Sequence, residues 1–429
     1  MTASAVPAAA TIRAAGRVET AVARASLAVV ALHVIDDNFL QPQPGTSAAD
    51  HLVSGLVPLG AVIASLVGYP SLRAGLRATL ALALGVLSIV GGAGEAGYYA
   101  REVGLSGDDY TGLLMIPAGI ALVSLGALTL WRTRKTDDRL RRRSVRRLGL
   151  ALAAIVVLAV VIFPIAQSYV ITHAARAVVP EPRLGAAHED VTLTTSDGLE
   201  LSGWYVPSRN GAAVIAFPGR SGPQRQARML VGHGYGVLLF DRRGEGESEG
   251  DPNTLGWGLV RDLEAALAFL ERRADVEPGR IGGIGLSVGG ELLLEAAAED
   301  ERLAAVVSEG AGIRSAREAA LAPGVQRVIA LPIWTTTTVA TAVFSNHLPP
   351  PSLQDVVARI APRPVFLIYA GNGQGGEELS ADYFEAAGEP KTLWEIPEAG
   401  HTGGIEARPA EYERRVTTFF DRALLGEGR

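Results

Sequence analysis

The sequence contains no cysteine, and this absence excludes several kinds of chemistry. A disulfide, a thiolate nucleophile and a cysteine zinc site all require that residue. Charge is also scarce, since only 20% of the 429 residues are Asp, Glu, Lys or Arg. Hydrophobic residues make up 48%, which excludes a chain that is disordered as a whole. The composition favours a folded protein with a membrane part, and the length favours two domains.

Basic residues are concentrated in one segment, which the net charge of -6 conceals. The segment from Arg132 to Arg147 holds nine Arg/Lys and two Asp/Glu, and removing it leaves 30 basic and 43 acidic residues. The remainder therefore has no excess of basic residues that would suit nucleic acid. We predict no nucleic-acid partner, because contact with the anionic lipid of a bilayer already accounts for the basic segment.

Apolar runs crowd the first 172 residues. We predict an N-terminal cytoplasmic segment (1–20), a transmembrane domain (21–172) and a linker (173–188). The first run also resembles the apolar core of a signal peptide, although Asp36 and Asp37 close it without a small-residue cleavage site. Five runs approach the roughly 20 apolar residues that a helix needs to cross a bilayer, and they cover Ala21–Phe39, Leu52–Tyr69, Ala78–Ala93, Thr111–Trp131 and Leu148–Thr172.

The arginines between these runs predict their orientation, because Lys and Arg in short loops stay on the cytoplasmic side. Fourteen Arg/Lys lie in the N-terminal segment and in the second and fourth loops, whereas the opposite loops hold only Arg101. Five crossings from a cytoplasmic N-terminus place everything after Thr172 outside the cytoplasm. We therefore predict a multi-pass protein of the cell membrane whose second half is extracytoplasmic.

Several acids and histidines fall near the outer ends of the helical runs. Carboxylates and imidazoles are able to bind a divalent metal or a lipid head group. Their spacing matches no metal motif, so we interpret them as polar caps at the membrane interface and predict neither a metal nor a cofactor. These residues are His33, Asp36, Asp37, Asp50, His51, Asp108 and Asp109.

From about Glu189 the pattern changes to short β-rich runs that alternate with amphipathic helices. This alternation is typical of an α/β domain with a mostly parallel sheet, which we place at residues 189–425. Helices are clearest at Leu255–Arg273 and Val288–Ala298. We expect an opening antiparallel hairpin followed by further strands, at Val191–Thr194, Leu199–Tyr205, Ala213–Phe217, Val237–Phe240, Arg280–Leu286, Ala304–Ser308, Val365–Tyr369 and Thr392–Ile396.

One strand ends in the G-x-S-x-G pattern Gly285-Leu286-Ser287-Val288-Gly289, and a helix-forming segment follows. This context is the one that a nucleophile elbow requires, because small neighbours let the strand and helix pass close to a strained turn. The alternative is a glycine-rich turn with an incidental serine. We predict that Ser287 is a catalytic nucleophile.

A serine needs a base within hydrogen-bond reach, and the base is usually histidine. The chain has seven histidines. His401 follows the last strand in a loop, where a parallel sheet displays catalytic groups. His233 is expected to end a helix, and His347 lies in an inserted segment. We predict His401 as the base, with a loop-stabilising histidine as the alternative.

With these motifs in order, residues 189–425 resemble the α/β-hydrolase superfamily, in its branch of serine esterases, lipases and serine aminopeptidase-like hydrolases. Phe217-Pro218-Gly219-Arg220-Ser221-Gly222 stands where that family has its oxyanion loop, and Phe240 to Ser248 is similar to its D-x-R-G-x-G-x-S segment. The resemblance implies that the backbone N–H groups of Val288 and Arg220 face the oxyanion. For the second donor, Gly219 and Ser221 are alternatives, since Pro218 replaces the usual histidine.

The acid of the triad is where the sequence departs from the family pattern. Members usually carry an aspartate shortly after the strand that here ends at Tyr369, whereas this chain has no aspartate before Asp382. A carboxylate is needed to hold the histidine tautomer. Glu377 is our choice and Glu378 the close alternative, while both also suit an ordinary first turn of a helix.

An insertion at about 310–361 occupies the usual position of a lid in this superfamily. It contains a charge-free run from Val328 to Asn346. A sixth membrane span there would put Ser287 and His401 on opposite faces, and Pro332 with four threonines weakens the helix signal. We therefore expect a lid over an apolar pocket, which favours esters with hydrophobic or lipid-like acyl groups.

The sequence thus predicts a membrane-anchored serine hydrolase that cleaves carboxylic esters and contacts the lipid bilayer and a small-molecule or lipid-like ester. A serine aminopeptidase-like peptidase is an alternative, because the same triad cleaves amides. A second alternative is an inactive membrane receptor or scaffold, suggested by the displaced acid. A third is a transporter-like bundle, although no internal repeat or broken-helix pair supports transport.

Overall fold

The structure is a computed structural model of the whole chain, and it divides into two compact units, Met1–Ala151 and Leu152–Arg429. It describes residues 8–41, 48, 52–102, 107–132, 149–150, 153, 156–174, 178–373 and 375–426. Asp50, His51 and most of the basic segment that starts at Arg132 lie outside these residues. So do parts of the fifth predicted span and of the linker. Each unit is described by itself.

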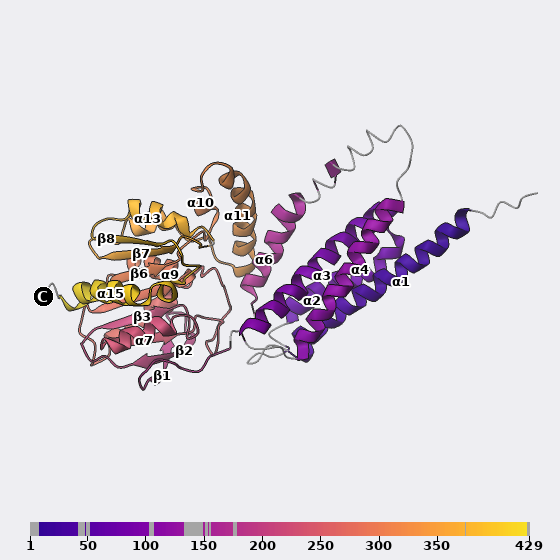
Figure 1. The fold of residues 1–429 in the computed structure, drawn as a ribbon. Coiled ribbons are helices and arrows are strands. Elements are labelled where there is room, and N and C mark those ends of the chain that lie inside the picture. Colours follow the sequence, from indigo (N-terminus) through magenta and orange to yellow (C-terminus); the bar gives the residue numbers. More distant parts are fainter. Residues whose placement is uncertain are drawn as a thin grey trace, which may run out of the picture. The chain divides into compact units, whose positions relative to one another are not determined.

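The first unit is a bundle of helices (Figure 1). Its core is formed by small and branched apolar side chains, among them Ala23, Leu27 and Leu122. The helices are α1 (Ala8–Ile35) with a π-helical end η1 (Asp36–Leu40), α2 (Leu52–Gly68) with a 3-10 turn η2 (Tyr69–Ser71), α3 (Ala74–Glu102) and α4 (Gly107–Arg132).

Glycines bring helices α3 and α4 close together. A Cβ atom at Gly85 would lie 2.7 Å from the carbonyl oxygen of Gly119, and one at Gly119 would lie 2.6 Å from that of Gly85. A Cβ at Gly126 would likewise meet the carbonyl of Ala78 at 2.9 Å. Close backbone approach through small residues is the usual way in which helices associate in lipid, where there is no hydrophobic drive between them.

Four helices among the described residues are long and apolar enough to cross a membrane, namely Gly16–Leu40, Ala74–Ala93, Thr111–Arg132 and Gly324–Ser345. The first three correspond to the first, third and fourth predicted spans. The second and fifth predicted spans fall on shorter apolar helices, Gly55–Ser71 and Leu158–Thr172. The fourth long helix lies in the segment that we interpreted as a lid.

The second unit contains one eight-stranded sheet in the order β1-β2-β4-β3-β5-β6-β7-β8. Strands β1 and β2 form the antiparallel hairpin that the sequence predicts, and β3 to β8 pair in parallel. The strands are β1 (Glu189–Thr194), β2 (Glu200–Val206), β3 (Ala213–Phe217), β4 (Gly236–Phe240), β5 (Ile281–Leu286), β6 (Leu303–Glu309), β7 (Val365–Ala370) and β8 (Lys391–Ile396).

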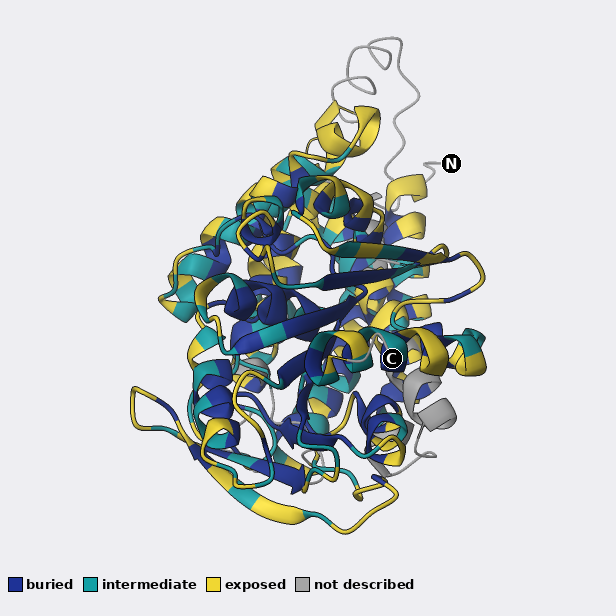
Figure 2. Ribbon diagram, turned by 90° about the vertical axis from the view of Figure 1, so that its left-hand side faces the viewer, coloured by how far each residue is buried: buried dark blue, intermediate teal, exposed yellow. Residues whose placement is uncertain are grey.

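Helices cover both faces of this sheet, as expected for parallel strands that are buried on both sides (Figure 2). One face packs against α8 (Val260–Glu271), α9 (Val288–Glu299), α12 (Leu353–Val357) and α13 (Ser380–Ala386). The other face packs against α7 (Gln224–Gly232), α14 (Gly404–Ala407) and α15 (Pro409–Phe420), which η5 (Asp421–Leu425) extends. His233 ends α7, as the sequence predicts.

The inserted segment after β6 forms α10 (Ala316–Ala319) and α11 (Gly324–Ser345) before α12 begins. Helix α11 packs beside α6 (Phe163–Thr172), which continues the π-helical turn η3 (Leu158–Ile162). The described end of the fifth apolar run therefore groups with the α/β unit, because the two compact units divide near residue 151. The run groups with this unit because α6 and η3 pack against α11. An apolar sequence pattern alone does not show whether a helix contacts lipid or another helix.

Candidate functional site

Ser287 lies in the turn between β5 and α9, with φ 52° and ψ -125°. A positive φ is costly for any residue other than glycine, and this strained turn is the hallmark of a nucleophile elbow. The neighbouring glycines are needed for steric reasons. A Cβ at Gly289 would lie 2.5 Å from the carbonyl oxygen of Phe217, and one at Gly285 would overlap the backbone of Gly289. Local sequence thus fixes the geometry of the turn.

His401 lies in the loop that follows β8, and its Nδ1 hydrogen-bonds to Oε1 of Glu377 in the loop after β7. The two loops are joined by their backbones, since Gly371 N–H donates to the Ile396 carbonyl at 2.9 Å and Asn372 N–H to that of Ala399 at 3.1 Å. The last two parallel strands therefore bring the acid to the histidine.

Glu377 is almost completely buried, whereas Glu378 is exposed. The second oxygen of Glu377 accepts the N–H of Ala370 at 3.0 Å, so both carboxyl oxygens are occupied. The hydrogen bond that His401 donates to Glu377 raises the pKa of His401, against the opposing effect of burial. Of the two glutamates that the sequence left open, the structure places Glu377 on the histidine.

Ser287 and His401 line one cavity of about 400 Å³. It opens at the carboxyl ends of the parallel strands, where α/β sheets bind their ligands. Among the described residues, those that line it include none from α11. The lining consists of Thr254, Leu255, Ser287, Val288, Glu291, Gly310, Gly312, Ile313, Gly375 and His401.

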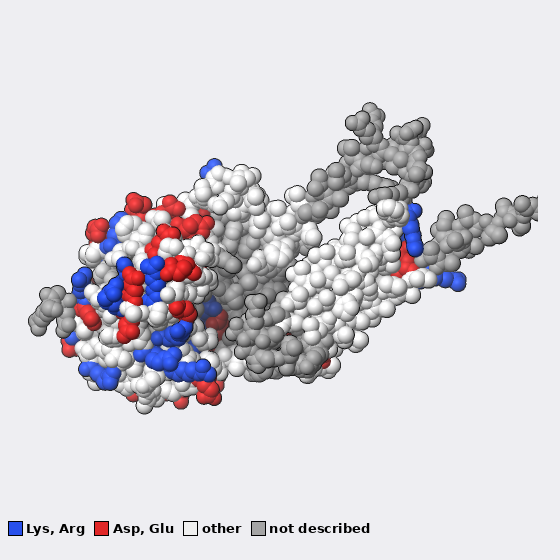
Figure 3. Space-filling view, in the orientation of Figure 1, with Lys and Arg blue, Asp and Glu red and all other residues white. Residues whose placement is uncertain are grey.

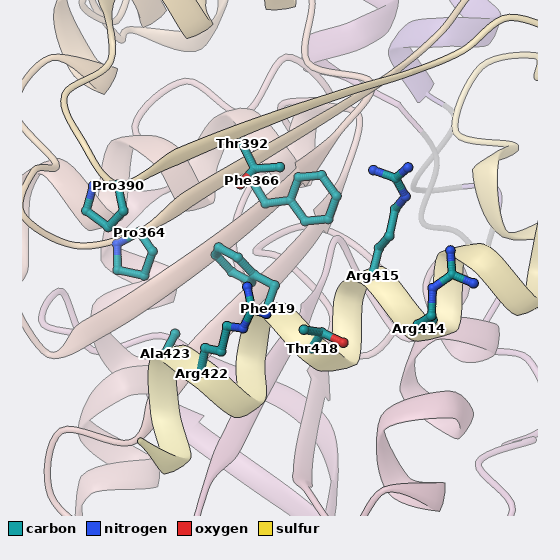
Figure 4. Close-up of a pocket in the computed structure, with 10 residues that line it drawn as sticks. All are labelled: Pro364, Phe366, Pro390, Thr392, Arg414, Arg415, Thr418, Phe419, Arg422 and Ala423. Carbon is teal, nitrogen blue, oxygen red and sulfur yellow. The ribbon is translucent and has the colours of Figure 1, made fainter. Parts of the chain in front are cut away.

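A larger cavity of about 690 Å³ lies at the opposite end of the sheet (Figure 4). Pro364 and Pro390, which immediately precede β7 and β8, line it together with Phe419 and three arginines of the C-terminal helix and its extension η5. None of the predicted catalytic residues lines this cavity. Because chemistry in such sheets occurs at the carboxyl ends of the strands, the smaller cavity is the candidate active site.

The two predicted oxyanion donors differ in their surroundings. Val288 is the first residue of α9 and lines the cavity, and the first amides of a helix have no partner within it. The N–H of Arg220 instead donates to Asp241 at 2.8 Å, and its buried guanidinium pairs with Asp241 and Glu247. The expectation that Arg220 supplies the second donor is therefore not supported, because its amide is already bonded. Its neighbours in the loop are the remaining candidates.

Two buried glutamates of the site were missed by sequence reasoning. Glu291 lines the cavity and accepts the N–H of Gly312 at 3.1 Å, and burial raises its pKa. Glu309, at the end of β6, accepts the N–H of Gly404 at 2.8 Å and the hydroxyl of Tyr412 at 2.6 Å. It thus holds the start of α14, three residues after His401. The only sequence signals for them are positional: Glu309 stands at the end of a predicted strand, and Glu291 follows the predicted nucleophile by four residues.

Two of the polar residues that the sequence places near helix ends have local partners in the bundle. His33 hydrogen-bonds to Thr111 at 3.0 Å, and Asp36 accepts a bond from Gln41 at 3.2 Å. Within the described part of the chain, no group of three His, Asp or Glu residues is arranged to hold a metal ion. On the second unit, acidic and basic side chains are interspersed on the face shown in Figure 3.

Comparisons with known proteins found similar chains. The protein named Uncharacterized protein YfhR of Escherichia coli (strain K12) is 27% identical over 260 residues, which cover 55% of this chain and 81% of that protein. Uncharacterized protein Rv2307c of Mycobacterium tuberculosis is 31% identical over 224 residues, which cover 50% of this chain and 73% of that protein. Among solved structures, the Pyrococcus furiosus esterase Pf2001 is 24% identical with a TM-score of 0.46, over 58% of this chain and 98% of that one.

A protein-family model also matches the chain. It covers residues 172–394, which is slightly more than half of the sequence, and is described as X-Pro dipeptidyl-peptidase (S15 family). The match includes the strained serine turn and the acid loop but ends before His401. The chain therefore belongs to the S15 family, as a hydrolase of the α/β-hydrolase superfamily that the sequence resembles.

Proposed function

We propose that this protein is a membrane-anchored serine hydrolase that cleaves carboxylic esters through Ser287, His401 and Glu377. The observation that carries the proposal is the buried carboxylate of Glu377 on Nδ1 of His401, at the cavity that Ser287 also lines. A carboxylate in this position selects the tautomer whose Nε2 accepts a proton, and it stabilises the imidazolium that results.

In the proposed reaction, the Oγ of Ser287 attacks the ester carbonyl while Nε2 of His401 takes the hydroxyl proton. The oxyanion of the tetrahedral intermediate accepts a hydrogen bond from the N–H of Val288 and from an amide of the 217–222 loop. The C–O bond then breaks, and His401 returns its proton to the leaving alcohol. Water, activated by the same histidine, releases the acid and restores Ser287.

The cavity favours an apolar substrate group. Leu255, Val288 and Ile313 are the apolar residues with long side chains that line its wall. We propose esters with hydrophobic or lipid-like acyl groups as the substrates. The apolar helices and the distribution of arginines support membrane anchoring with the α/β unit outside the cytoplasm.

Hydrolysis of p-nitrophenyl esters of increasing acyl length by the purified full chain tests this proposal. We expect turnover to fall by at least about 10³-fold in Ser287→Ala and the wild type to prefer longer acyl groups. The matched control is Ser196→Ala, which removes an exposed hydroxyl from the turn between β1 and β2, away from the cavity. Equal turnover in wild type and Ser287→Ala would contradict the proposal.

A second candidate is the release of N-terminal dipeptides. It is favoured by the description of the matched family and by Glu291, a buried carboxyl group at the cavity with the chemistry to pair with a substrate ammonium. Comparing Ala-Pro-p-nitroanilide with p-nitrophenyl butyrate separates the two functions. If the anilide is the better substrate, and Glu291→Gln raises its KM without changing that of the ester, the peptidase assignment replaces the esterase.

A further inference from the structure

Helices α6 and α11 run side by side in the same direction (Figure 1). The hydroxyl of Ser168 donates to the carbonyl of Thr337 at 3.2 Å, and both residues are buried. One residue further along α6, the ring of Tyr169 meets that of Phe344 edge-on, with centroids 5.4 Å apart. The later residue of α6 contacts the later residue of α11, so the two helices are parallel.

This register places the first half of α11 beside the fifth apolar run. Gly324 precedes Thr337 by thirteen residues, which corresponds to about 20 Å along a helix axis. The start of α11 is therefore level with residues near Val156, and α11 indeed packs against Leu158–Ile162. The first half of α11 thus lies alongside the segment that is predicted to cross the bilayer.

Apolar side chains are exposed on both helices at this level. On α11, Val325, Val328 and Ile329 are 71%, 70% and 61% exposed. On the neighbouring segment, Val156 and Phe163 are each 57% exposed. Large apolar side chains exposed at one level of two packed helices are costly in water, and such exposure marks contact with another apolar phase.

The charges on this surface suit a lipid partner. No acidic residue occurs from Leu148 to Pro180 or from Ala319 to Gln354. The second stretch carries a single arginine, Arg327, in the exposed first turns of α11. These stretches of the two helices therefore carry almost no charge, which suits contact with acyl chains.

The threonines of α11 are compatible with lipid, although the sequence suggested otherwise. The hydroxyls of Thr335, Thr336 and Thr337 donate to the carbonyls four residues earlier, at 2.6, 3.1 and 3.0 Å. Their polar groups are therefore paired within the helix. This pairing removes most of the cost of placing a hydroxyl in hydrocarbon.

A complete crossing by α11 conflicts with the sheet. Strands β6 and β7, which precede and follow the inserted segment, pair directly from Val306 and Val365 onwards. Moreover, the N–H of Ala316 donates to the hydroxyl of Thr338 at 2.8 Å, so the chain approaches α11 from beside its second half. Both ends of the segment therefore lie on the same side of any membrane that α11 enters.

We propose that α11 is a re-entrant helix, whose first half is embedded in the leaflet next to the α/β unit, alongside residues 156–163. The end of α6 is tied to the catalytic cavity, because Thr254, a lining residue, donates its N–H to the Ile171 carbonyl at 3.0 Å. The helix pair thus provides a path for a lipid acyl chain from the leaflet to Ser287. The path, but not the embedding of α11, rests on the proposed function.

Site-specific fluorescence tests the embedding, and the absence of native cysteine makes single labelling sites available. Val328→Cys is labelled with an NBD fluorophore in the full-length Ser287→Ala chain and reconstituted in phosphatidylcholine/phosphatidylglycerol vesicles. Blue-shifted emission and quenching by doxyl groups on the lipid acyl chains are expected. Glu277→Cys, at a side chain that is 59% exposed on the α/β unit, is the control and should be quenched by aqueous iodide.

If the label at position 328 is quenched by iodide and not by doxyl lipid, α11 is a surface lid and the proposal is wrong. Because this measurement uses an inactive background, it is independent of the proposed catalysis. A second variant, Val328→Asp, tests the path: hydrolysis of a long-chain ester in vesicles should fall at least about fivefold, with a soluble butyrate ester unaffected. Equal effects on both esters would contradict the proposed acyl-chain path but not the embedding of α11.

Discussion

Glu377 and His401 are joined by a hydrogen bond from Nδ1 to Oε1, although their side chains differ greatly in exposure, 1% against 40%. The carboxylate is fixed by the Ala370 amide in a dry environment, whereas the imidazole reaches the cavity. This arrangement lets a buried charge orient a ring that is accessible to substrate. This hydrogen bond identifies Glu377, and not the adjacent Glu378, as the carboxylate that contacts His401.

Glu377→Gln should lower kcat for ester hydrolysis by at least about 10²-fold, because the amide favours the wrong histidine tautomer. Glu378→Gln is the matched control, since that neighbouring side chain is exposed and its change should alter kcat less than about twofold. Steady-state kinetics of both variants provide the measurement. Equal losses in the two variants would mean that the acid is not Glu377.

The pH dependence of kcat/KM should report the same contact. The hydrogen bond that His401 donates to Glu377 raises the pKa of His401 above its ordinary value of about 6.5. A general base must be unprotonated, so the acidic limb of the wild-type profile should lie above that pH. In Glu377→Gln the limb should move to lower pH while the plateau falls. A limb that stays in place would indicate that another group is titrating.

The serine turn could be predicted from the sequence because its requirements are local: a strand, small neighbours and a helix within a few residues. The choice between Glu377 and Glu378 depends on how one loop folds onto the next strand, which spacing does not determine. Glu291 looked like any polar residue on a helix, and its burial depends on the loop at Gly312. Likewise, the apolar pattern of α6 is expected both for a helix in a membrane and for a helix that packs against α11, so it does not decide between them.

Glu291→Gln should stabilise the protein at alkaline pH. Burial raises the pKa of Glu291 in the folded state, so its contribution to stability is complete below the unfolded value of about 4.3 and is lost as the pH rises through the folded pKa. Glutamine stays neutral throughout. The Tm of the variant should exceed that of the wild type by about 2 °C or more at pH 8, and by less at pH 5. A pH-independent difference would show that Glu291 does not titrate in this way.

The arginine asymmetry predicts the side of the membrane on which catalysis occurs. Ser71→Cys, in the exposed turn between α2 and α3, should be protected from an impermeant maleimide in intact cells. Glu277→Cys, on the α/β unit, should react. The native chain is free of cysteine and gives no background. The reverse labelling pattern would place the hydrolase on the cytoplasmic side and change the pool of substrates that it meets.

Covalent labelling with a fluorophosphonate, followed by mass spectrometry of the modified peptide, tests the central claim most directly. The reagent reports an activated serine without knowledge of the substrate. The account predicts a single adduct on Ser287 in the wild type, no adduct in Ser287→Ala, and labelling that is at least about 10²-fold slower in His401→Ala. An adduct on another serine, or undiminished labelling of Ser287→Ala, would contradict it.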